Sequence, residues 1–259
     1  MAQDLVISRF APSPTGRLHL GHAYSAMLAH DLARAAGGRF FLQIEDIDVG
    51  RCRAEFVEGI CEDLRWLGLE WDGEVLVQSR RMAVYAEALE RLDAMGMIYR
   101  CWCTRAEIAA ASASAPQGAE GPIYLGTCKG RSDPGDGRAY CWRLDVGGND
   151  PVIARKDTPT SYHLSVVVDD AAQGVTDIVR GKDLESAVPV QTLLQNLLGL
   201  PTPRYRHHPL IGGADGERLA KRRNSPTLVI LREGGADPKQ VVAEMRRERF
   251  PFGFSLLGA

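Results

Sequence analysis

The side chains best suited to chemistry near the start of the chain are the two histidines of His19-Leu-Gly-His22. An imidazole N–H group can donate a hydrogen bond to a phosphate oxygen, and the glycine between the rings lets a flat base lie against the backbone. This short motif indicates a phosphate-binding turn. An ordinary turn with exposed histidines is the alternative, because a motif match alone is only a hypothesis.

The residues around this turn predict the elements that would position the histidines. The apolar residues 5–7 indicate a short buried strand, and apolar residues between 28 and 35 recur at helical spacing until Gly37-Gly38 ends the helix. A turn between a strand and a helix leaves backbone N–H groups and the positive helix end facing an anion. The glycines are too few and wrongly spaced for a P-loop or a G-x-G-x-x-G motif.

A second group of reactive side chains is the cysteine cluster Cys101, Cys103 and Cys128. In a reducing compartment, cysteines grouped in this way favour a bound metal over disulfides. Three thiolates need a fourth donor to complete a tetrahedral zinc shell. Three buried reduced cysteines without metal are the alternative. The other three of the six cysteines have no such spacing and are expected to be core or surface thiols.

Length and composition limit the possible classes of protein. A chain of 259 residues can form one large α/β domain with a small appendage, or two modest domains. No apolar run approaches the length of a membrane span, and the first residues lack the basic and apolar regions of a signal peptide. We therefore expect a cytoplasmic protein that has no membrane partner. The net charge of −2 excludes a globally basic nucleic-acid binder, so any RNA contact would use local patches. The candidate cations are Arg222, Arg223, Arg246 and Arg247.

The segments around these motifs resemble the glutamyl-tRNA synthetases, which are class I aminoacyl-tRNA synthetases. His19-Leu-Gly-His22 follows Arg9-Phe-Ala-Pro-Ser-Pro-Thr-Gly16 and stands at the place of the HIGH motif of that class. The resemblance spans nearly the whole chain, with several specific motifs in the right order. These further motifs are Gln43-Ile-Glu-Asp-Ile-Asp48, Trp66-Leu-Gly-Leu-Glu-Trp-Asp72, Gln78-Ser-Arg80, Tyr162-His-Leu164, Asp169-Asp170, Gly174-Val-Thr-Asp-Ile-Val-Arg-Gly181 and Arg218-Leu-Ala-Lys-Arg222.

The resemblance implies a pocket for L-glutamate. The residues that it assigns to this pocket are Arg9, Ala11, Ser13, Glu45, Tyr162 and Arg180. An arginine fork matches a carboxylate, so Arg180, with Arg9 as a second cation, suits the side chain of glutamate. Phe40, Leu42 and Ile44 alternate with polar residues along a predicted strand, after which the Glu45 carboxylate could meet the α-amino group.

One departure from the family affects this pocket. Residues 162–168 predict a long strand, and many tRNA-charging members carry an amide where Val166 stands. The polar contacts of the glutamate pocket are therefore expected to differ from those of the tRNA-charging enzymes.

The resemblance also implies an ATP site. Its expected residues are His19, Gly21, His22, Arg218 and Lys221, of which His19, His22 and Lys221 are the expected catalytic residues. Flexible glycines followed by cations fit a mobile loop that closes over phosphates, and the two cations stand at the lysine positions of the KMSKS motif. Ala220 replaces the usual serine of that motif. Mg²⁺ is expected to accompany ATP, although no dedicated set of ligands is evident.

The cysteine cluster has its own counterpart in the family. Some members place C-x-C and Y-x-x-x-C at this point of the sequence and bind one structural zinc ion. The resemblance therefore implies a Zn²⁺ site formed by Cys101, Cys103, Tyr124 and Cys128.

The expected architecture is a Rossmann-like class I catalytic core in the α/β class, with a small zinc-binding insertion and a short helical C-terminal part. The two halves of the core are expected at residues 1–100 and 146–223, the insertion at 101–145 and the C-terminal segment at 224–259. In that segment, Ser225-Pro226 and Asp237-Pro238 each indicate the start of a short helix.

A short chain of this kind resembles the glutamyl-queuosine tRNA(Asp) synthetases, a subgroup without an anticodon-binding domain. This resemblance implies a ligase, expected to be a monomer, that activates L-glutamate with ATP and transfers it to queuosine in the anticodon loop of tRNA(Asp). Two alternatives remain open. One is a truncated glutamyl-tRNA synthetase that charges a tRNA 3′ end, and the other is a non-catalytic tRNA-binding remnant.

Overall fold

The structure, a computed structural model, describes residues 5–112, 123–134, 136–213, 219 and 226–258. The strands are β1 (Ile7–Phe10), β2 (Arg39–Ile44), β3 (Leu76–Val77), β4 (Ile98–Cys101), β5 (Cys141–Leu144), β6 (Val152–Ala154), β7 (Asp177–Gly181), β8 (Arg204–His208), β9 (Ile211–Gly212) and β10 (Ser255–Leu256). The α-helices are α1 (Leu20–Ala35), α2 (Ala54–Trp66), α3 (Met82–Ala94), α4 (Arg105–Ala111), α5 (Tyr162–Ala172), α6 (Val188–Leu197), α7 (Leu228–Glu233) and α8 (Pro238–Arg246). Short 3₁₀ helices span Gln78–Arg80, Lys182–Ala187 and Pro251–Gly253.

The chain divides into two compact units, each formed by segments distant in sequence. The first unit contains residues 1–80, 172–188 and 202–259, and the second contains residues 81–171 and 189–201. Both ends of the chain therefore belong to the first unit. The four ranges expected from the sequence stay a prediction.

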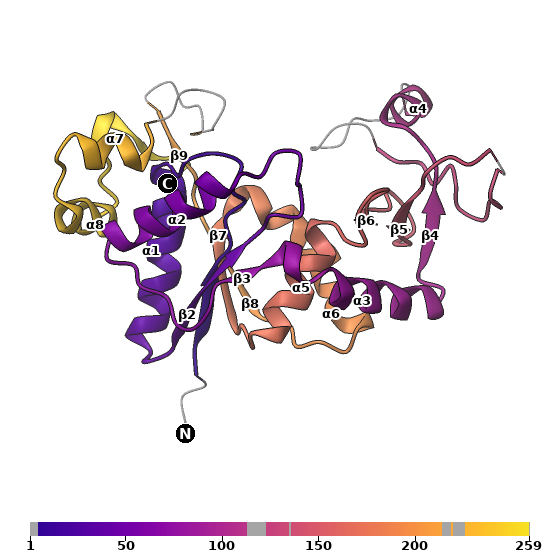
Figure 1. Cartoon of the computed structure of the whole chain (residues 1–259), viewed down its shortest axis with the longest axis horizontal. Coiled ribbons are helices and arrows are strands. Elements are labelled where there is room, and N and C mark those ends of the chain that lie inside the picture. The colour runs from indigo at the N-terminus through magenta and orange to yellow at the C-terminus, as the bar shows by residue number, and fades with distance from the viewer. Residues whose placement is uncertain (1–4, 113–122, 135, 214–218, 220–225, 259) are drawn as a thin grey trace. The chain divides into compact units, whose positions relative to one another are not determined.

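The first unit is built on a parallel sheet (Figure 1). Among the described residues, its strands lie in the order β3-β2-β1-β7-β8, and all neighbouring strands pair in parallel. The helix α1 connects β1 to β2 and packs on β1, β2 and β7. Phe40, Leu42 and Ile44 are fully buried in the core beneath this helix, as the predicted strand requires, but Phe41 and Gln43 on the other face of β2 are buried as well. The Rossmann-like parallel sheet flanked by helices is thus confirmed, with β1 in its centre.

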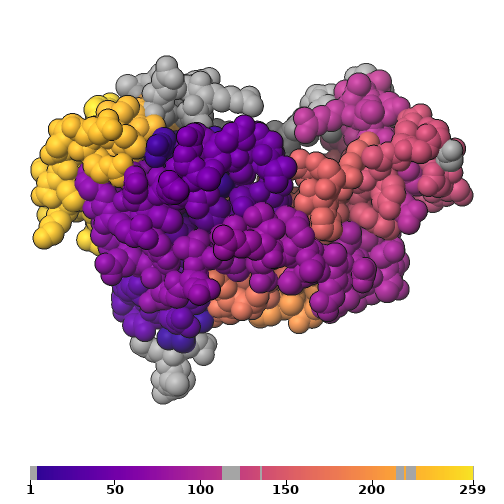
Figure 2. All heavy atoms as spheres, viewed as in Figure 1, coloured from indigo at the N-terminus to yellow at the C-terminus, as the bar shows by residue number. Residues whose placement is uncertain are grey.

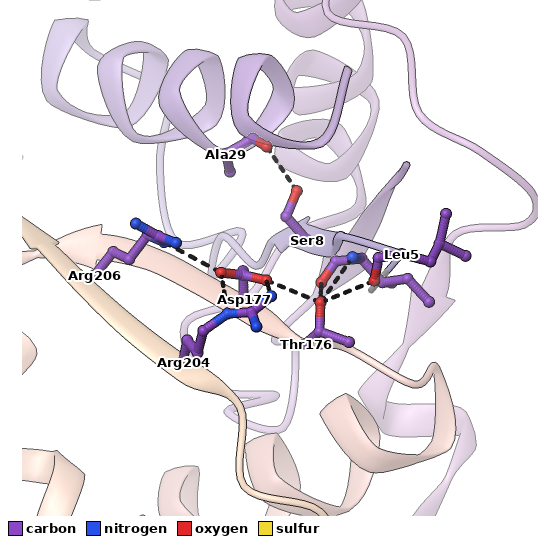
Figure 3. A network of polar contacts seen from close by, with 8 residues as sticks. Leu5, Ser8, Ala29, Thr176, Asp177, Arg204 and Arg206 are labelled. Atoms are coloured by element: carbon purple, nitrogen blue, oxygen red, sulfur yellow. Dashed lines mark hydrogen bonds and ion pairs between the residues drawn. The ribbon is translucent and has the colours of Figure 1, made fainter. Parts of the chain in front are cut away.

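A buried carboxylate holds the strands β7 and β8 together (Figure 3). Asp177 is fully buried and accepts hydrogen bonds from Arg204 at 2.7 and 3.0 Å, from Arg206 at 3.1 Å and from Thr176 at 2.9 Å. Burial alone would raise the pKa of Asp177, but the hydrogen bonds from Thr176 and the two arginines lower it below its usual value. Asp177 is therefore ionised at neutral pH and anchors the edge strand.

The second unit combines an antiparallel sheet, in the order β4-β5-β6, with the helices α3, α4, α5 and most of α6. Its core contains Tyr85, Leu92, Leu144, Leu164 and Leu194, all fully buried. The strands β4 and β5 pair in antiparallel register from Ile98 opposite Leu144 to Cys101 opposite Cys141.

The strand predicted at residues 162–168 is wrong, because these residues form the first two turns of α5. Residues 164–170 are all buried, so the helix has no polar stripe that would reveal its period. A continuous apolar run rich in valine does not distinguish a buried helix from a buried strand. Here the helical backbone begins where the Ser165 N–H donates to the Ser161 carbonyl at 3.0 Å.

Two short helices form the C-terminal part in the first unit. Asp237 caps α8 by accepting from the Lys239 N–H at 3.0 Å, as the sequence predicts. The helix expected to begin at Pro226 begins instead at Leu228, with Thr227 at the cap position, and Ser225 lies outside the described residues. No helix in the described ranges is both long and apolar enough to cross a membrane. The expected cytoplasmic location and monomeric state stay predictions.

Candidate functional site

The turn after β1 is closed by its own two histidines. Nδ1 of His19 accepts a hydrogen bond from the Gly21 N–H at 3.1 Å, and Nδ1 of His22 accepts one from the His19 N–H at 3.2 Å. The His19 side chain also accepts from the His22 N–H, and this bond together with the one from the His19 N–H to His22 forms a capping box at the start of α1. A ring nitrogen that accepts carries no proton, so each neutral ring has its proton on Nε2. Both rings, whose centroids lie 3.8 Å apart, can therefore offer Nε2–H donors to an anion.

Gly21 is required here for a reason that the sequence did not reveal. A Cβ atom at this position would lie 3.0 Å from Cε1 and 3.2 Å from Nδ1 of His19. Such contacts are too close for an unmoved imidazole, so a side chain at residue 21 would displace the His19 ring. The glycine thus sets the position of a predicted catalytic side chain.

The described residues that follow the KMSKS-like sequence contact this turn directly. Thr227 forms an antiparallel backbone bridge with His19, and the Leu228 N–H donates to the Leu18 carbonyl at 2.9 Å. Arg218, Ala220 and Lys221 themselves lie outside the described residues, as do Arg222 and Arg223. The ATP-binding and catalytic roles expected of Arg218 and Lys221 stay predictions.

Arg180 on β7 is held by two residues of the neighbouring strand β8. Its side chain is 5% exposed, its Nε donates to Nε2 of His207 at 3.2 Å, and its guanidinium carbon lies 5.0 Å from the Tyr205 ring centroid. Burial lowers the pKa of His207, and the charge of Arg180 lowers it further. The His207 ring is therefore a neutral acceptor at pH 7. Because a guanidinium carries five N–H donors in one plane, this arrangement orients a fork that matches a carboxylate.

Arg9 is a second buried cation on the same side of the sheet. It is 4% exposed on β1, where its neighbour Phe10 belongs to the core that packs on α1. Val179, the neighbour of Arg180 on β7, belongs to the same core. Because side chains alternate along a strand, Arg9 and Arg180 both project from the opposite face of two adjacent strands.

A carboxylate completes this edge of the sheet. Glu45 directly follows β2, the other neighbour of β1, and accepts a hydrogen bond from the Ser13 hydroxyl at 3.2 Å. Ser13 and Ala11 belong to the loop that follows β1. The carboxyl ends of three adjacent parallel strands thus carry two buried cations and one carboxylate, at the edge where open α/β sheets bind ligands. Tyr162 begins α5 in the second unit, and its expected contact with glutamate stays a prediction.

Three of the four expected zinc ligands gather in the second unit. The sulfur atoms of Cys101, Cys103 and Cys128 all lie within 4.8 Å of one another, with 3.4 Å between those of Cys103 and Cys128. The hydroxyl of Tyr124 accepts from the Cys128 N–H at 2.8 Å and is also hydrogen-bonded to the Cys101 side chain. Sulfurs bound tetrahedrally to one zinc ion lie about 3.8 Å apart, given Zn–S bonds of about 2.3 Å. This donor set is therefore compatible with a metal ion.

Two further residues lie against this cluster that no sequence pattern indicated. Cys141 on β5 lies opposite Cys101 on β4 and donates from its thiol to the Cys101 carbonyl at 3.5 Å. The guanidinium carbon of Arg143 lies 3.6 Å from the centroid of the Tyr124 ring. Side-chain alternation along β5 places Cys141 and Arg143 on one face. That face can be assigned to the cluster only once the pairing of β5 with β4 is known. None of the six cysteines forms a disulfide.

Comparisons with known proteins agree with this arrangement. The family described as tRNA synthetases class I (E and Q), catalytic domain, matches residues 5–132 and 139–252. The glutamyl-Q tRNA(Asp) synthetase of Rhodobacter capsulatus is 47% identical over 91% of this chain and 98% of its own length. The protein of the same name from Symbiobacterium thermophilum is 43% identical over 93% and 85% of the two lengths.

A solved structure shows the same fold. The glutamate-tRNA synthetase from Elizabethkingia anophelis superposes with a TM-score of 0.82 at 24% identity, over 95% of this chain. This chain spans 62% of the length of that protein. The chain therefore belongs to the class I tRNA synthetases of the E and Q type and, within them, to the glutamyl-Q tRNA(Asp) synthetases.

Proposed function

We propose that this protein activates L-glutamate with ATP and transfers the glutamyl group to queuosine of tRNA(Asp). The observation that carries the amino-acid part is the buried pair Arg9 and Arg180 on adjacent strands, beside Glu45 on the third. Free glutamate has two carboxylates and one ammonium group. The arginines bind its side-chain carboxylate, and Glu45 binds its α-ammonium group. The names of the relatives supply the RNA part.

The first chemical step is adenylate formation. The α-carboxylate of glutamate attacks the α-phosphorus of ATP, the bond to the β-phosphate oxygen breaks, and pyrophosphate leaves with the electron pair. His19 and His22 donate from Nε2 to phosphate oxygens on which negative charge develops. Mg²⁺ neutralises phosphate charge when it is bound with ATP. The site thus acts by positioning and by charge stabilisation, and it needs no general base for this step.

In the second step, a hydroxyl group of the RNA attacks the carbonyl carbon of glutamyl-adenylate and AMP leaves. A loop nucleotide can be presented outside the base stack, where its hydroxyl groups are accessible. The hydroxylated ring of queuosine then offers the same nucleophile as a terminal ribose.

A zinc ion in the second unit forms the structural part of this proposal. The three cysteine sulfurs and the Tyr124 hydroxyl supply four donors, which is the number that a closed structural zinc site requires. This metal would tie the end of β4 to the segment that contains Cys128. It would stabilise the fold and take no part in the chemistry.

The location of the attached glutamate tests the RNA part. The protein is incubated with radioactive glutamate, ATP and bulk tRNA, and the tRNA is digested to nucleosides. We expect the label on queuosine, and we expect none when the tRNA comes from cells that cannot make queuosine. Label on the terminal adenosine of tRNA(Glu) would instead support a tRNA-charging enzyme. Absence of glutamate-dependent pyrophosphate exchange would leave the non-catalytic alternative.

A substitution at Gly21 tests the histidine turn. We expect Gly21→Ala to lower the rate of pyrophosphate exchange about tenfold, because the new methyl group displaces the His19 ring. Alanine is favoured over glycine within a helix by about 1 kcal/mol. The variant should therefore unfold at the same or a higher temperature, as measured by circular dichroism. Unchanged exchange would mean that the position of His19 is not critical.

A further inference from the structure

A buried carboxylate outside the substrate site lies close to the histidine turn in the fold. Asp63, in the last turns of α2, is fully buried, and its Oδ1 accepts from Nη1 of Arg232 at 3.1 Å. Its second oxygen has no hydrogen-bond partner among the described residues. Glu62 also contacts Arg232, at 3.4 Å, but it is 58% exposed. Asp63 is thus the buried anion of this group, and none of the steps above uses it.

A second arginine, in the turn itself, lies close enough for its charge to act on Asp63. Arg17, two residues before His19, lies across Gly59, which is one helical turn before Asp63 on α2. A Cβ atom on Gly59 would lie 2.1 Å from Nη1 of Arg17, so a side chain at this position would push the guanidinium away from α2. The charge of Arg17 is close enough to act on the Asp63 carboxyl.

The two arginines belong to the two segments that meet at His19. Arg17 and Leu18 precede His19, while Arg232 lies on α7, which begins directly after Thr227. The backbones of these segments pair where Thr227 bridges His19 and the Leu228 N–H donates to Leu18. The helices α2 and α7 pack against each other, and Figure 2 shows the C-terminal residues, in yellow, packed against the violet N-terminal part. Asp63 therefore binds an arginine of one segment and is acted on by the charge of an arginine of the other.

We propose that Asp63 is a positioning residue, which holds the histidine turn in its phosphate-binding geometry by attracting Arg17 on one side and Arg232 on the other. This inference rests on the proposed function, because it assigns Asp63 to the ATP half of that reaction. The residues assigned to glutamate, Arg9, Arg180 and Glu45, belong to the sheet and to its carboxyl edge. Loss of the Asp63 charge should therefore affect ATP more than glutamate.

The ionisation of Asp63 falls within an accessible pH range. Burial raises the pKa of Asp63 to about 6, although Arg232 and Arg17 act to lower it and Glu62 acts to raise it. Above this pH the carboxylate is charged and attracts both arginines, and below it the neutral acid attracts them weakly. In the unfolded chain the pKa is about 3.9. Because the folded pKa is higher, the contribution of this group to stability falls as the pH rises from about 4 to about 6.

Because the charge of Asp63 lowers stability at neutral pH, a substitution that removes this charge can separate a positioning role from a folding role. Asparagine has the shape of the protonated acid, so Asp63→Asn should not lower the unfolding temperature at pH 7.5. Its KM for ATP in pyrophosphate exchange should rise about tenfold at that pH, with the KM for glutamate changed less than twofold. Arg17→Gln, a substitution at an exposed residue, should raise the KM for ATP in the same direction. Glu62→Gln removes the charge of the exposed neighbouring carboxylate and is the matched control. Its KM for ATP and its unfolding temperature should equal those of the wild type.

The pH profile supplies the second readout. At subsaturating ATP, the ratio of wild-type to Asp63→Asn exchange activity should fall from about ten at pH 7.5 to about two at pH 5, where only about a tenth of Asp63 is ionised, while other titrating groups cancel in the ratio. An unchanged KM for ATP in Asp63→Asn, or a ratio independent of pH, would overturn the assignment. If the wild type shows no glutamate-dependent exchange, the proposed function has failed. Calorimetric titration with ATP then decides the positioning role, with about tenfold weaker binding to Asp63→Asn supporting it and equal binding refuting it.

Discussion

Replacement of Arg180 by alanine is expected to raise the KM for glutamate by about 10²–10³-fold in pyrophosphate exchange. Arg180 is 5% exposed and is held by His207 and by the Tyr205 ring, so its charge is largely shielded from water. Removing one partner of a buried, hydrogen-bonded charge pair costs about 2–5 kcal/mol. A cost of about 3–4 kcal/mol corresponds to this rise in KM, because about 1.4 kcal/mol is a factor of ten.

The sheet itself supplies the control for this substitution. Arg206 lies on β8, paired in register with Val179 beside Arg180, but it is about half exposed and bound to Asp177. Arg206→Ala should leave the KM for glutamate within about threefold of the wild type. Arg180→Lys keeps the charge and loses the planar fork, so it should recover only part of the lost affinity. A KM for glutamate that is insensitive to Arg180→Ala would remove this residue from the pocket.

The local sequence predicts the histidine turn well because the constraints that form it are local. A strand, a capped helix start and a glycine between two histidines all lie within the same short stretch, and the capping bonds join His19, Gly21 and His22 to one another. Phe40, Leu42 and Ile44 likewise indicate the strand β2 and the face that packs under α1, although the burial of Gln43 on the other face does not follow from the local pattern. Each of these features follows from residues a few positions apart.

Features that depend on pairing between distant segments could not be predicted in this way. Arg180 contacts His207 only because β7 and β8 pair in one particular register, which no local pattern specifies. Asp63 accepts a hydrogen bond from Arg232, which lies on a helix 169 residues further along the chain. The helix that begins at Tyr162 was predicted as a strand, because burial on all sides removed the polar stripe that marks a helical period.

Removal of the metal site is expected to have the largest effect on stability. We expect one zinc ion per chain in the purified protein, and we expect Cys103→Ser to lose it and to lower the unfolding temperature by about 6–12 °C. Structural zinc contributes about 10–16 kcal/mol to the folding of small zinc-binding peptides. If the bound metal contributes about 3 kcal/mol to the free energy of unfolding of this chain, its loss lowers the unfolding temperature of a chain of this size by about the amount stated.

The position of the cluster determines what this variant should keep. Cys101, Cys103, Tyr124 and Cys128 all belong to the second unit, whereas His19 and the buried arginines belong to the first. At low temperature the variant should therefore retain pyrophosphate exchange within about tenfold of the wild type, while hydrogen exchange becomes faster around β4 and β5. Cys52→Ser, at a partly buried cysteine of the first unit, is the matched control and should change neither metal content nor stability. Purified protein without zinc, in which the three clustered thiols react freely while it remains folded, would contradict the metal site and favour three reduced cysteines.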